Sequence, residues 1–215
     1  LNPVLTVGKH LALVMQARKE RRSVVAMFEG WDAAGKGGAI RRVTAAIDAR
    51  LFRVISVASP TDEERAQHYL WRFWRHLPRA GYVTIYDRSW YGRVLVERIE
   101  GYCRETEWKR GYDEINAFEA QLVDSGVTLI KLFMHVTQKE QDERFRERLE
   151  TPWKRWKTGK DDYRNRARRD DYLKAYADMF ERTDTKKARW TVIDGNNKKA
   201  ARIAALTAIA DQLEA

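Results

Sequence analysis

The sequence has little cysteine, no long apolar run and no pattern of histidines, and these absences restrict the class of protein. Cys103 is the single cysteine among 215 residues, which excludes an internal disulfide and suits a reducing compartment, so we expect a cytoplasmic protein. No apolar run approaches the ~18 residues that a membrane-spanning helix needs, so we expect no membrane partner. The histidines, His10, His68, His76 and His135, lack metal-ligand spacing, and we assign no metal to them.

Positive charge, in contrast, is abundant. Lysine and arginine number 41 against 31 aspartate and glutamate residues, which gives a net charge of +10. A surplus of this size favours a polyanion or a highly phosphorylated substrate as partner. The apolar content of 44% is enough for a full hydrophobic core, and we expect a single domain over residues 1–215.

A glycine-rich loop follows the first apolar stretch of the chain. Residues 24–28 are apolar, and they lead into the segment G-W-D-A-A-G-K-G-G at residues 30–38 and then into a helical pattern. Strand, glycine loop and helix in this order form the phosphate-binding loop of P-loop proteins. Glycines let backbone N–H groups approach an anion, the helix directs the positive end of its dipole to the same point, and Lys36 adds a mobile positive charge.

The loop departs from the usual P-loop motif at one position. The motif places a serine or threonine after the lysine to hold Mg²⁺, and this chain has Gly37 there. We therefore expect another oxygen ligand for the metal, and Asp32 inside the loop is the candidate. A glycine-rich turn without a ligand is the alternative interpretation, but it does not account for the combination of four glycines with a lysine.

A second motif, D-R-S-W-Y-G-R at residues 87–93, follows another apolar strand. Asp87 ends the apolar run at residues 82–86, which is the position of a Walker-B aspartate that holds Mg²⁺. Arg88 would then lie beside the metal, where its guanidinium can form two hydrogen bonds to one phosphate. The alternative is that Asp87 caps the next helix and that Arg88 is its ion-pair partner.

A strongly basic segment covers residues 144–182 and contains Trp153 and Trp156. Within it, Arg144 and Arg148 are four residues apart in a helical pattern and therefore share a face. Kinases close basic lids over phosphates to exclude water that would accept the phosphoryl group. We therefore expect a lid here, with a pair of solvated charged helices as the alternative.

The order of the remaining patterns predicts an α/β fold. We expect helices at residues 5–22, 36–50, 61–77, 106–125, 138–149 and from 197 onward, and strands at residues 24–28, 51–57, 82–86, 127–135 and 190–193. This alternation implies a three-layer sandwich, a central parallel sheet with helices on both faces. Ligands of such sheets bind at the carboxyl ends of the strands, where both the glycine loop and Asp87 fall.

Four of these segments together resemble the family-2 polyphosphate kinases. They are the loop at residues 30–38, P-T-D-E-E-R at 60–65, D-R-S-W-Y at 87–91 and R-F-R-E-R at 144–148, and the resemblance covers nearly the whole chain. It implies a thymidylate-kinase-like P-loop fold with a basic helical lid. It also implies Mg²⁺-dependent phosphoryl transfer between inorganic polyphosphate and an adenine nucleotide, with Mn²⁺ as an alternative metal, in a homo-oligomer.

The resemblance also implies roles for individual residues. Asp32 and Asp87 are expected to bind the metal, Lys36 to bind phosphate, and Arg88 and Arg148 to hold the transferring and acceptor phosphates. The other expected binding positions are Gly30, Ala33, Ala34, Gly35, Gly37, Gly38, Arg41, Arg144, Lys154 and Lys157 for polyphosphate, and Arg93 beside Arg88 and Arg148 for the nucleotide.

The choice of acceptor also follows from this resemblance. Trp31 and residues 91–98 look most like the polyphosphate:AMP phosphotransferase subgroup, which makes ADP from AMP and typically carries two tandem copies of this domain. We therefore expect AMP as the acceptor, and we expect this chain to be one catalytic half of such a protein.

Three other functions stay open at this point. A polyphosphate:ADP phosphotransferase that makes ATP and an ATP-dependent nucleotide kinase would share the fold, and a basic nucleic-acid-binding module would also explain the positive charge. A nucleic-acid-binding module explains neither Lys36 in its loop nor Asp87 at a strand end, so we expect no specific nucleic-acid partner. A nucleotide phosphate is already anionic near neutral pH and needs no general base, which agrees with motifs that contain carboxylates and cations but no histidine.

Overall fold

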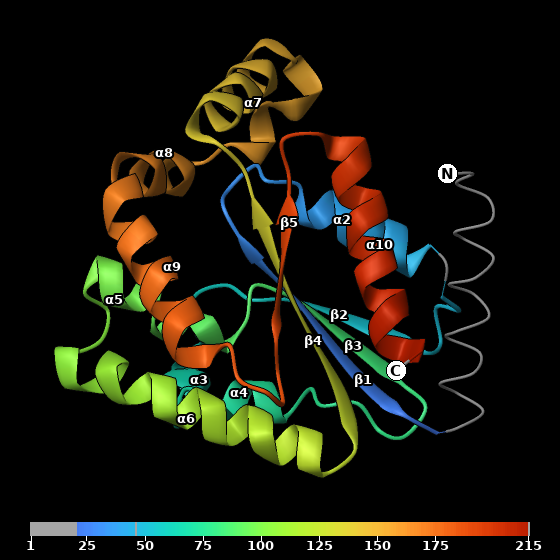
Figure 1. Ribbon diagram of the computed structural model, residues 1–215. Helices are drawn as coiled ribbons and strands as arrows, with labels where there is room; N and C mark the ends of the chain where they lie inside the picture. Colours follow the sequence, from blue (N-terminus) through green and yellow to red (C-terminus); the bar gives the residue numbers. More distant parts are fainter. Residues whose placement is uncertain (1–20, 46, 215) are drawn as a thin grey trace.

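The computed structural model describes residues 21–45 and 47–214, which form an α/β fold around one sheet (Figure 1). The strands are β1 (Ser23–Gly30), β2 (Phe52–Ser56), β3 (Val83–Asp87), β4 (Val127–His135) and β5 (Trp190–Asp194). Their order is β2-β3-β1-β4-β5, and every neighbouring pair is parallel. The predicted parallel sheet is therefore confirmed, whereas the helix predicted at residues 5–22 lies almost entirely outside the described residues.

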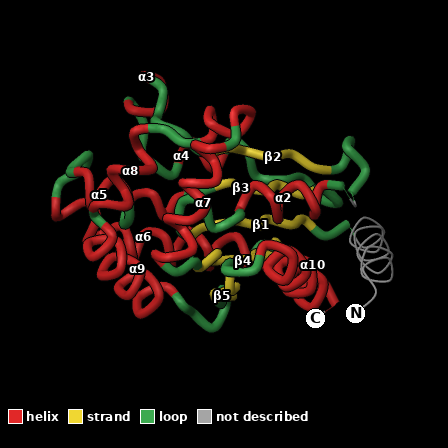
Figure 2. Tube along the Cα trace, turned by 90° about the horizontal axis from the view of Figure 1, so that it is seen from above, coloured by secondary structure: helices red, strands yellow, loops and turns green. Residues whose placement is uncertain are grey.

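Helices cover both faces of the sheet and confirm the predicted three layers. Figures 1 and 2 show α2 and α10 on one face and α5, α6 and α9 on the other. The helices are α2 (Lys36–Thr44), α3 (Asp62–Arg65), α4 (Trp71–Trp74), α5 (Val96–Glu100), α6 (Glu105–Asp124), α7 (Gln138–Glu150), α8 (Lys160–Ala167), α9 (Arg169–Thr183) and α10 (Lys198–Glu214), with 3₁₀ helices η1 (Trp90–Arg93) and η2 (Pro152–Lys157). In the part of the chain that the structure describes, no helix has both the length and the apolarity to cross a bilayer.

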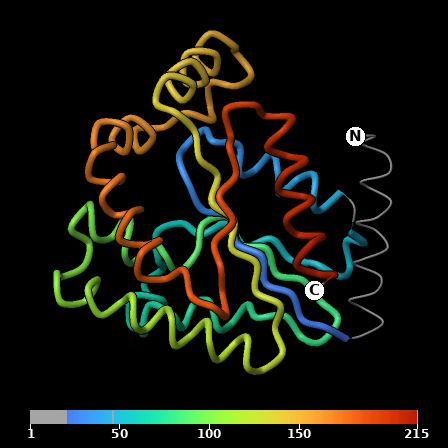
Figure 3. Tube along the Cα trace, in the orientation of Figure 1, coloured from blue at the N-terminus to red at the C-terminus, as the bar shows by residue number. Residues whose placement is uncertain are grey.

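The central position of β1 determines where the glycine loop lies. Residues 24–28 of β1 are all buried, because β3 and β4 flank this strand and helices cover both of its faces. The strand consequently reads as a continuous apolar run rather than as an alternating pattern. After β1 the chain forms β2 at one edge of the sheet and then β3 between β2 and β1, and it continues on the other side of β1 with β4, as Figure 3 traces. The loop after β1 therefore lies where the strand order reverses.

The helix after the glycine loop is shorter than predicted. It ends at Thr44 instead of continuing to about residue 50. A turn replaces its last part: the Asp48 carboxylate accepts a hydrogen bond from the backbone N–H of Arg50 at 3.0 Å, and the Asp48 carbonyl accepts one from Leu51 at 2.8 Å. Aspartate competes with helical hydrogen bonds in this way, and the turn leads directly into β2.

The helix predicted at residues 61–77 is also interrupted. Its start is confirmed, since Thr61 and Glu64 form a capping box at the N-terminus of α3. It is nevertheless divided into α3 and α4, and between them the backbone N–H of Leu70 points to the imidazole Nδ1 of His68 at 3.4 Å. Such a local side-chain acceptor diverts the N–H group from helical bonding.

The basic segment predicted as a lid divides into two structurally different parts. Its first part, with α7, η2 and α8, lies over the carboxyl edge of the sheet (Figure 1). Its second part, α9, instead packs on the sheet and buries Tyr172, Tyr176 and Met179 in the main core. The first part is therefore placed above this edge, whereas the second part is a layer of the sandwich.

A buried ion pair joins the sheet to helix α6. The ammonium of Lys131 on β4 lies 2.8 Å from a carboxylate oxygen of Glu119 on α6, and the two side chains are 0% and 1% exposed. Lys131 also donates to the hydroxyl of Tyr91 and to the carbonyl of Thr183, and Tyr91 and Trp90 both donate to Glu119. Burial raises the pKa of Glu119 and lowers the pKa of Lys131, and in each case the partner's charge opposes the shift. The network fixes the η1 turn that follows Asp87.

We expect the substitution Lys131→Met to lower the free energy of unfolding by about 3–5 kcal/mol, because it leaves the buried Glu119 carboxylate without a cation. Urea-induced unfolding measures this loss. The control is Lys187→Met, since Lys187 pairs with Asp124 at the surface, where the side chains are 49% and 60% exposed. Its loss should stay below about 1 kcal/mol. Equal losses for the two variants would contradict a structural role of the buried pair.

Candidate functional site

The glycine loop requires the backbone conformations that its glycines supply. Gly30 has φ of 119°, and a Cβ atom there would lie 2.2 Å from the carbonyl oxygen of Met134 on β4. Gly35 has φ of 108° and stands at the N-cap of α2. Both angles are rarely adopted by residues with side chains. At Gly37 the space is open, since a Cβ atom there would meet no atom within 4 Å outside its chain neighbours and the backbone of its own helix. The loop therefore presents the N-terminal end of α2 to a ligand.

The ammonium of Lys36 lies inside this loop. It donates hydrogen bonds to the carbonyl oxygens of Gly30 at 2.7 Å and Trp31 at 2.9 Å, and the residue is buried. Burial lowers the pKa of Lys36, and the negative charge of Asp32 opposes this shift most strongly. A positive charge is thus held where a phosphate at the helix N-terminus would meet it.

The carboxylate of Asp32 is held by two side chains from different parts of the fold. Its Oδ1 accepts a hydrogen bond from Arg88 at 2.7 Å, and its Oδ2 accepts one from the amide of Asn165 on α8 at 2.8 Å. Burial alone would raise the pKa of Asp32, but the cations Lys36 and Arg88, together with the Asn165 hydrogen bond, hold it below its usual value. Asp32 is therefore ionised at neutral pH, as a metal ligand must be.

The D-R-S motif is brought beside the loop by strand pairing. Asp87 pairs with Phe28 in the register of β3 and β1, and the backbone N–H of Arg88 donates to the carbonyl of Phe28 at 3.0 Å. Asp87 is half-buried and interacts electrostatically with Lys36. Arg88 has φ of 65°, a conformation that aims its side chain at Asp32. The structure thus gathers the proposed metal carboxylates and Arg88 around Lys36.

Glu29 is a further carboxyl group beside Lys36 that the sequence interpretation missed. It is 5% exposed, and it accepts a hydrogen bond from Ser89 at 2.8 Å. Burial raises the pKa of Glu29, while Ser89 and Lys36 oppose the shift. An acidic residue directly after a five-residue apolar run was the available signal for it.

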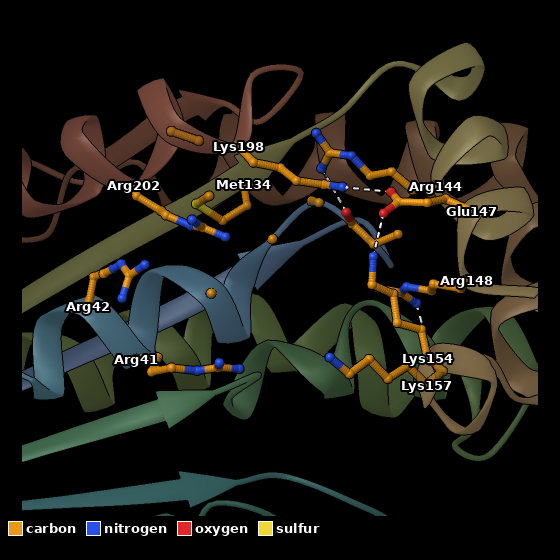
Figure 4. A pocket seen from close by; sticks show the side chains of 15 residues that line it. Arg41, Arg42, Met134, Arg144, Glu147, Arg148, Lys154, Lys157, Lys198 and Arg202 are labelled. Carbon is orange, nitrogen blue, oxygen red and sulfur yellow. Dashed lines mark hydrogen bonds and ion pairs between the residues drawn. The ribbon is translucent and has the colours of Figure 1, made fainter. Parts of the chain in front are cut away.

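A basic cavity of about 360 Å³ opens on one side of the loop (Figure 4). The loop residues Ala33, Ala34, Gly35 and Gly38 form part of its wall, and Glu147 is the single acidic residue of its lining. The remaining charged residues of the lining are cations from α2, α7, η2 and α10, namely Arg41, Arg42, Arg144, Arg148, Lys154, Lys157, Lys198 and Arg202. A concave surface with this excess of positive charge is suited to a polyanion.

Three of the expected cations line this cavity but differ in their burial and their hydrogen-bond partners. Arg144 is 3% exposed, and its guanidinium donates to the carbonyls of Ala33, Gly195 and Asn196, so it braces the loop as well as contributing charge. Arg148 donates to the carbonyl of Lys157 at 3.2 Å and thereby ties η2 to α7. Arg41, in contrast, extends from α2 toward the open space in Figure 4.

Arg93 is not brought to the site in the way that the sequence suggested. Its guanidinium lies 3.1 Å from the Glu97 carboxylate and 4.4 Å from the centre of the Tyr69 ring, and its side chain is 16% exposed. These contacts anchor α5 instead of presenting a cation to a ligand. A role of Arg93 in nucleotide binding therefore has no geometric support.

A second, smaller hollow of about 50 Å³ lies on the other side of the loop. Gly30, Asp32 and Arg88 form its wall on the loop side, with Asn165, Tyr172 and Tyr176 opposite. The loop thus stands between a large basic cavity and a hollow that contains Asp32.

Three cations of the cavity were not identified from the sequence. Arg42 follows Arg41 on α2, whereas Lys198 and Arg202 are four residues apart on α10, near the end of the chain. The presence of Lys198 and Arg202 at the loop depends on α10 packing beside α2, which no local pattern specifies. The i,i+4 spacing of two cations was the only indication of a shared face.

Among the described residues, no group of three or more His, Cys, Asp and Glu side chains could hold a metal ion. Asp32 and Asp87 nevertheless supply carboxylate oxygens, within the glycine loop and beside it. Mg²⁺ is typically bound by one or two carboxylates together with substrate phosphates and water, so this donor set fits Mg²⁺. It does not suit a metal that needs a complete cage of protein ligands.

Similarity to known proteins agrees with this geometry. The family model described as polyphosphate kinase 2 matches residues 6–215. A curated protein of Pseudomonas aeruginosa, polyphosphate:AMP phosphotransferase, is 52% identical over 94% of this chain and 41% of its own length. ADP-polyphosphate phosphotransferase 3 of Rhizobium meliloti is 44% identical over 86% of this chain and 66% of its own length. The chain thus spans less than half of the first of these relatives.

Solved structures show the same fold. A polyphosphate kinase 2 from Pseudomonas aeruginosa superposes with a TM-score of 0.95 at 50% identity, over 98% of this chain and 46% of that one. A polyphosphate kinase 2 from Arthrobacter aurescens gives a TM-score of 0.94 at 34% identity, over 98% of this chain and 76% of that one. Because the family model and the relatives cover almost the whole chain, the chain belongs to the polyphosphate kinase 2 family.

Proposed function

We propose that this chain transfers a phosphoryl group from inorganic polyphosphate to AMP and so produces ADP. The observation that carries the proposal is the basic cavity beside the loop, whose eight cations exceed what the short phosphate chain of a nucleoside triphosphate would neutralise. This surplus favours polyphosphate over ATP as the donor. Relatives named polyphosphate:AMP phosphotransferase, at 50–53% identity, support AMP as the acceptor.

The donor chain is held in the basic cavity in this proposal, with its terminal phosphate at the loop. Lys36, which donates to two loop carbonyls, would exchange one of them for a phosphate oxygen. Arg148 and the η2 lysines would cover the chain and exclude water, while the α2 and α10 cations would hold its distal part. The transferring phosphate therefore lies at the N-terminus of α2, where the helix dipole favours negative charge.

We further propose that Asp32 and Asp87 hold Mg²⁺, for which Mn²⁺ can substitute. When bound, the ion neutralises charge on the donor and acceptor phosphates. Arg88 already contacts Asp32 and lies between the loop and the second hollow, so it is placed to hold the acceptor phosphate. Its donors match phosphate geometry in a way that a lysine would not.

The proposed reaction needs no proton transfer. An anionic phosphate oxygen of AMP attacks the terminal phosphorus of the chain and forms a new P–O–P linkage. The anhydride bond to the next phosphate of the chain breaks, and its bridging oxygen keeps the electron pair, which leaves a polyphosphate one unit shorter. The transition state spreads negative charge over the transferring oxygens, and Lys36, Arg88 and Arg148 are the cations placed to stabilise it.

The test of this function is a product assay with long-chain polyphosphate, Mg²⁺ and either AMP or ADP. We expect ADP from AMP, and little ATP from ADP. The second candidate is formation of ATP from ADP, because the chain is also 44% identical to an ADP-polyphosphate phosphotransferase. ATP from ADP, with little ADP from AMP, would favour this second candidate. Absence of any nucleotide product from polyphosphate would contradict the proposed function.

The metal assignment predicts the effect of removing one carboxylate. Asp87→Asn should lower kcat by about 10²–10³-fold at saturating Mg²⁺, as expected when one preorganised electrostatic stabiliser is lost. Because Asp87 is half-buried at the end of a strand, thermal unfolding should change little. Asp124→Asn serves as the control, since Asp124 lies at the surface in its pair with Lys187, and it should keep full activity. Near wild-type turnover of Asp87→Asn would refute the metal role.

The basic cavity predicts a steep dependence of polyphosphate binding on salt. Binding that neutralises several phosphates releases counterions, so affinity should fall by at least a factor of ~10² between 50 and 200 mM salt, by analogy with nucleic acids. Replacing Arg42 by glutamine should weaken binding and lower the slope of log Kd against log salt by about 1. Titrations at several salt concentrations measure both slopes. An unchanged slope in Arg42→Gln would exclude that arginine from the bound chain.

A further inference from the structure

Glu147 stands out because it places a negative charge inside a cavity otherwise lined by cations. Its Oε1 lies 2.5 Å from the ammonium of Lys154 on η2, and its Oε2 lies 3.1 Å from that of Lys198 on α10 (Figure 4). One carboxylate thus bridges the segment above the site to the helix beside it. The hydrogen bond from Lys154, followed by the contacts with Lys198, lowers the pKa of Glu147 to about 2, so the carboxylate is ionised at every pH at which the enzyme would work.

Five of the eight cations of the cavity form two groups relative to this carboxylate. Lys154 and Lys198 contact it directly. Arg41, Arg42 and Arg202 lie at the opposite end of the cavity, over the α2 and α10 helices, as Figure 4 shows. A ligand confined to the end near Glu147 therefore meets Lys154 and Lys198, which are already paired with it, whereas a longer ligand also reaches three cations that lie away from the carboxylate.

We propose that Glu147 makes this cavity select long phosphate chains over short ones. The inference rests on the proposed function, because it concerns the donor of that reaction. A phosphate bound between Lys154 and Lys198 must separate both ammonium groups from Glu147 and then lies beside its negative charge. A short chain has few other contacts to offset this repulsion. A long chain adds contacts at Arg41, Arg42 and Arg202 and releases more counterions, so the same repulsion is a smaller part of its binding.

Partial exposure sets the size of the effect. The side chains of Glu147, Lys154 and Lys198 are 46%, 35% and 45% exposed, so water and salt screen each pair. The carboxylate is consequently a competitor that a substrate can displace, and not a permanent block. Its influence should be visible as a change in chain-length preference without loss of the fold.

The decisive variant is Glu147→Gln, which keeps the shape of the side chain and removes its charge. We expect tripolyphosphate to bind about fivefold to tenfold more tightly, the range that two partly exposed ion pairs allow, and long-chain polyphosphate to gain less than about threefold. Calorimetric titration at one fixed ionic strength, with both ligands and each variant, gives the four dissociation constants. Thermal unfolding of the variant shows that it is folded.

Two further variants complete the experiment. Glu143→Gln removes an exposed charge from the same helix, outside the lining of the cavity, and should leave both affinities unchanged. Arg202→Gln removes a cation from the opposite end and should weaken the long chain more than tripolyphosphate. The inference is overturned if Glu147→Gln changes both ligands by the same factor or changes neither, or if Arg202→Gln affects them equally. A wild-type protein that binds no polyphosphate of any length would instead refute the proposed function.

Discussion

The charge of Lys36 at the end of the central strand is the constraint on which the site depends. Its ammonium is buried against two carbonyls of its own loop, and the surrounding ionisable groups are Asp32, Asp87, Glu29 and Arg88. A buried ammonium is tolerated only where negative charges oppose its desolvation, and here the three carboxyl groups do so while Arg88 acts against them. The loop, the D-R-S motif and the acidic end of β1 therefore form one electrostatic unit, assembled by the pairing of β1 with β3.

The segment above the site is also organised around the loop. Asn165 of α8 donates to the Asp32 carboxylate, and Gln141 of α7 donates to the Asp32 carbonyl at 2.9 Å. Arg169 in turn donates to Gln141 at 2.8 Å, and its guanidinium lies 3.9 Å from the centre of the Trp31 ring. Helices that follow β4 are thereby tied to a loop that follows β1. Any ligand that changes the contacts of Asp32 would change the hold of α8 on the loop.

The parts of the site that could be predicted from the sequence are those written in consecutive residues. The loop at residues 30–38 and Asp87 at a strand end carry their own signals, and the alternation of strands with helices was sufficient for the parallel sheet. Asn165, Lys198 and Arg202 could not be found in this way, because their positions depend on how α8 and α10 pack on distant elements. The charges of α9 likewise concealed a face with Tyr172 and Tyr176 that belongs to the core.

The central claim is that a phosphate of the donor chain binds at the N-terminus of α2 and replaces one of the two loop carbonyls that accept from Lys36. Nuclear magnetic resonance of ¹⁵N-labelled protein during titration with tripolyphosphate tests it most directly. We expect the largest backbone amide shifts at Gly35, Gly37 and Gly38, with a further shift directly after Gly30 or Trp31, whichever carbonyl loses the lysine. Shifts confined to α7 and η2, with the loop amides unchanged, would contradict it.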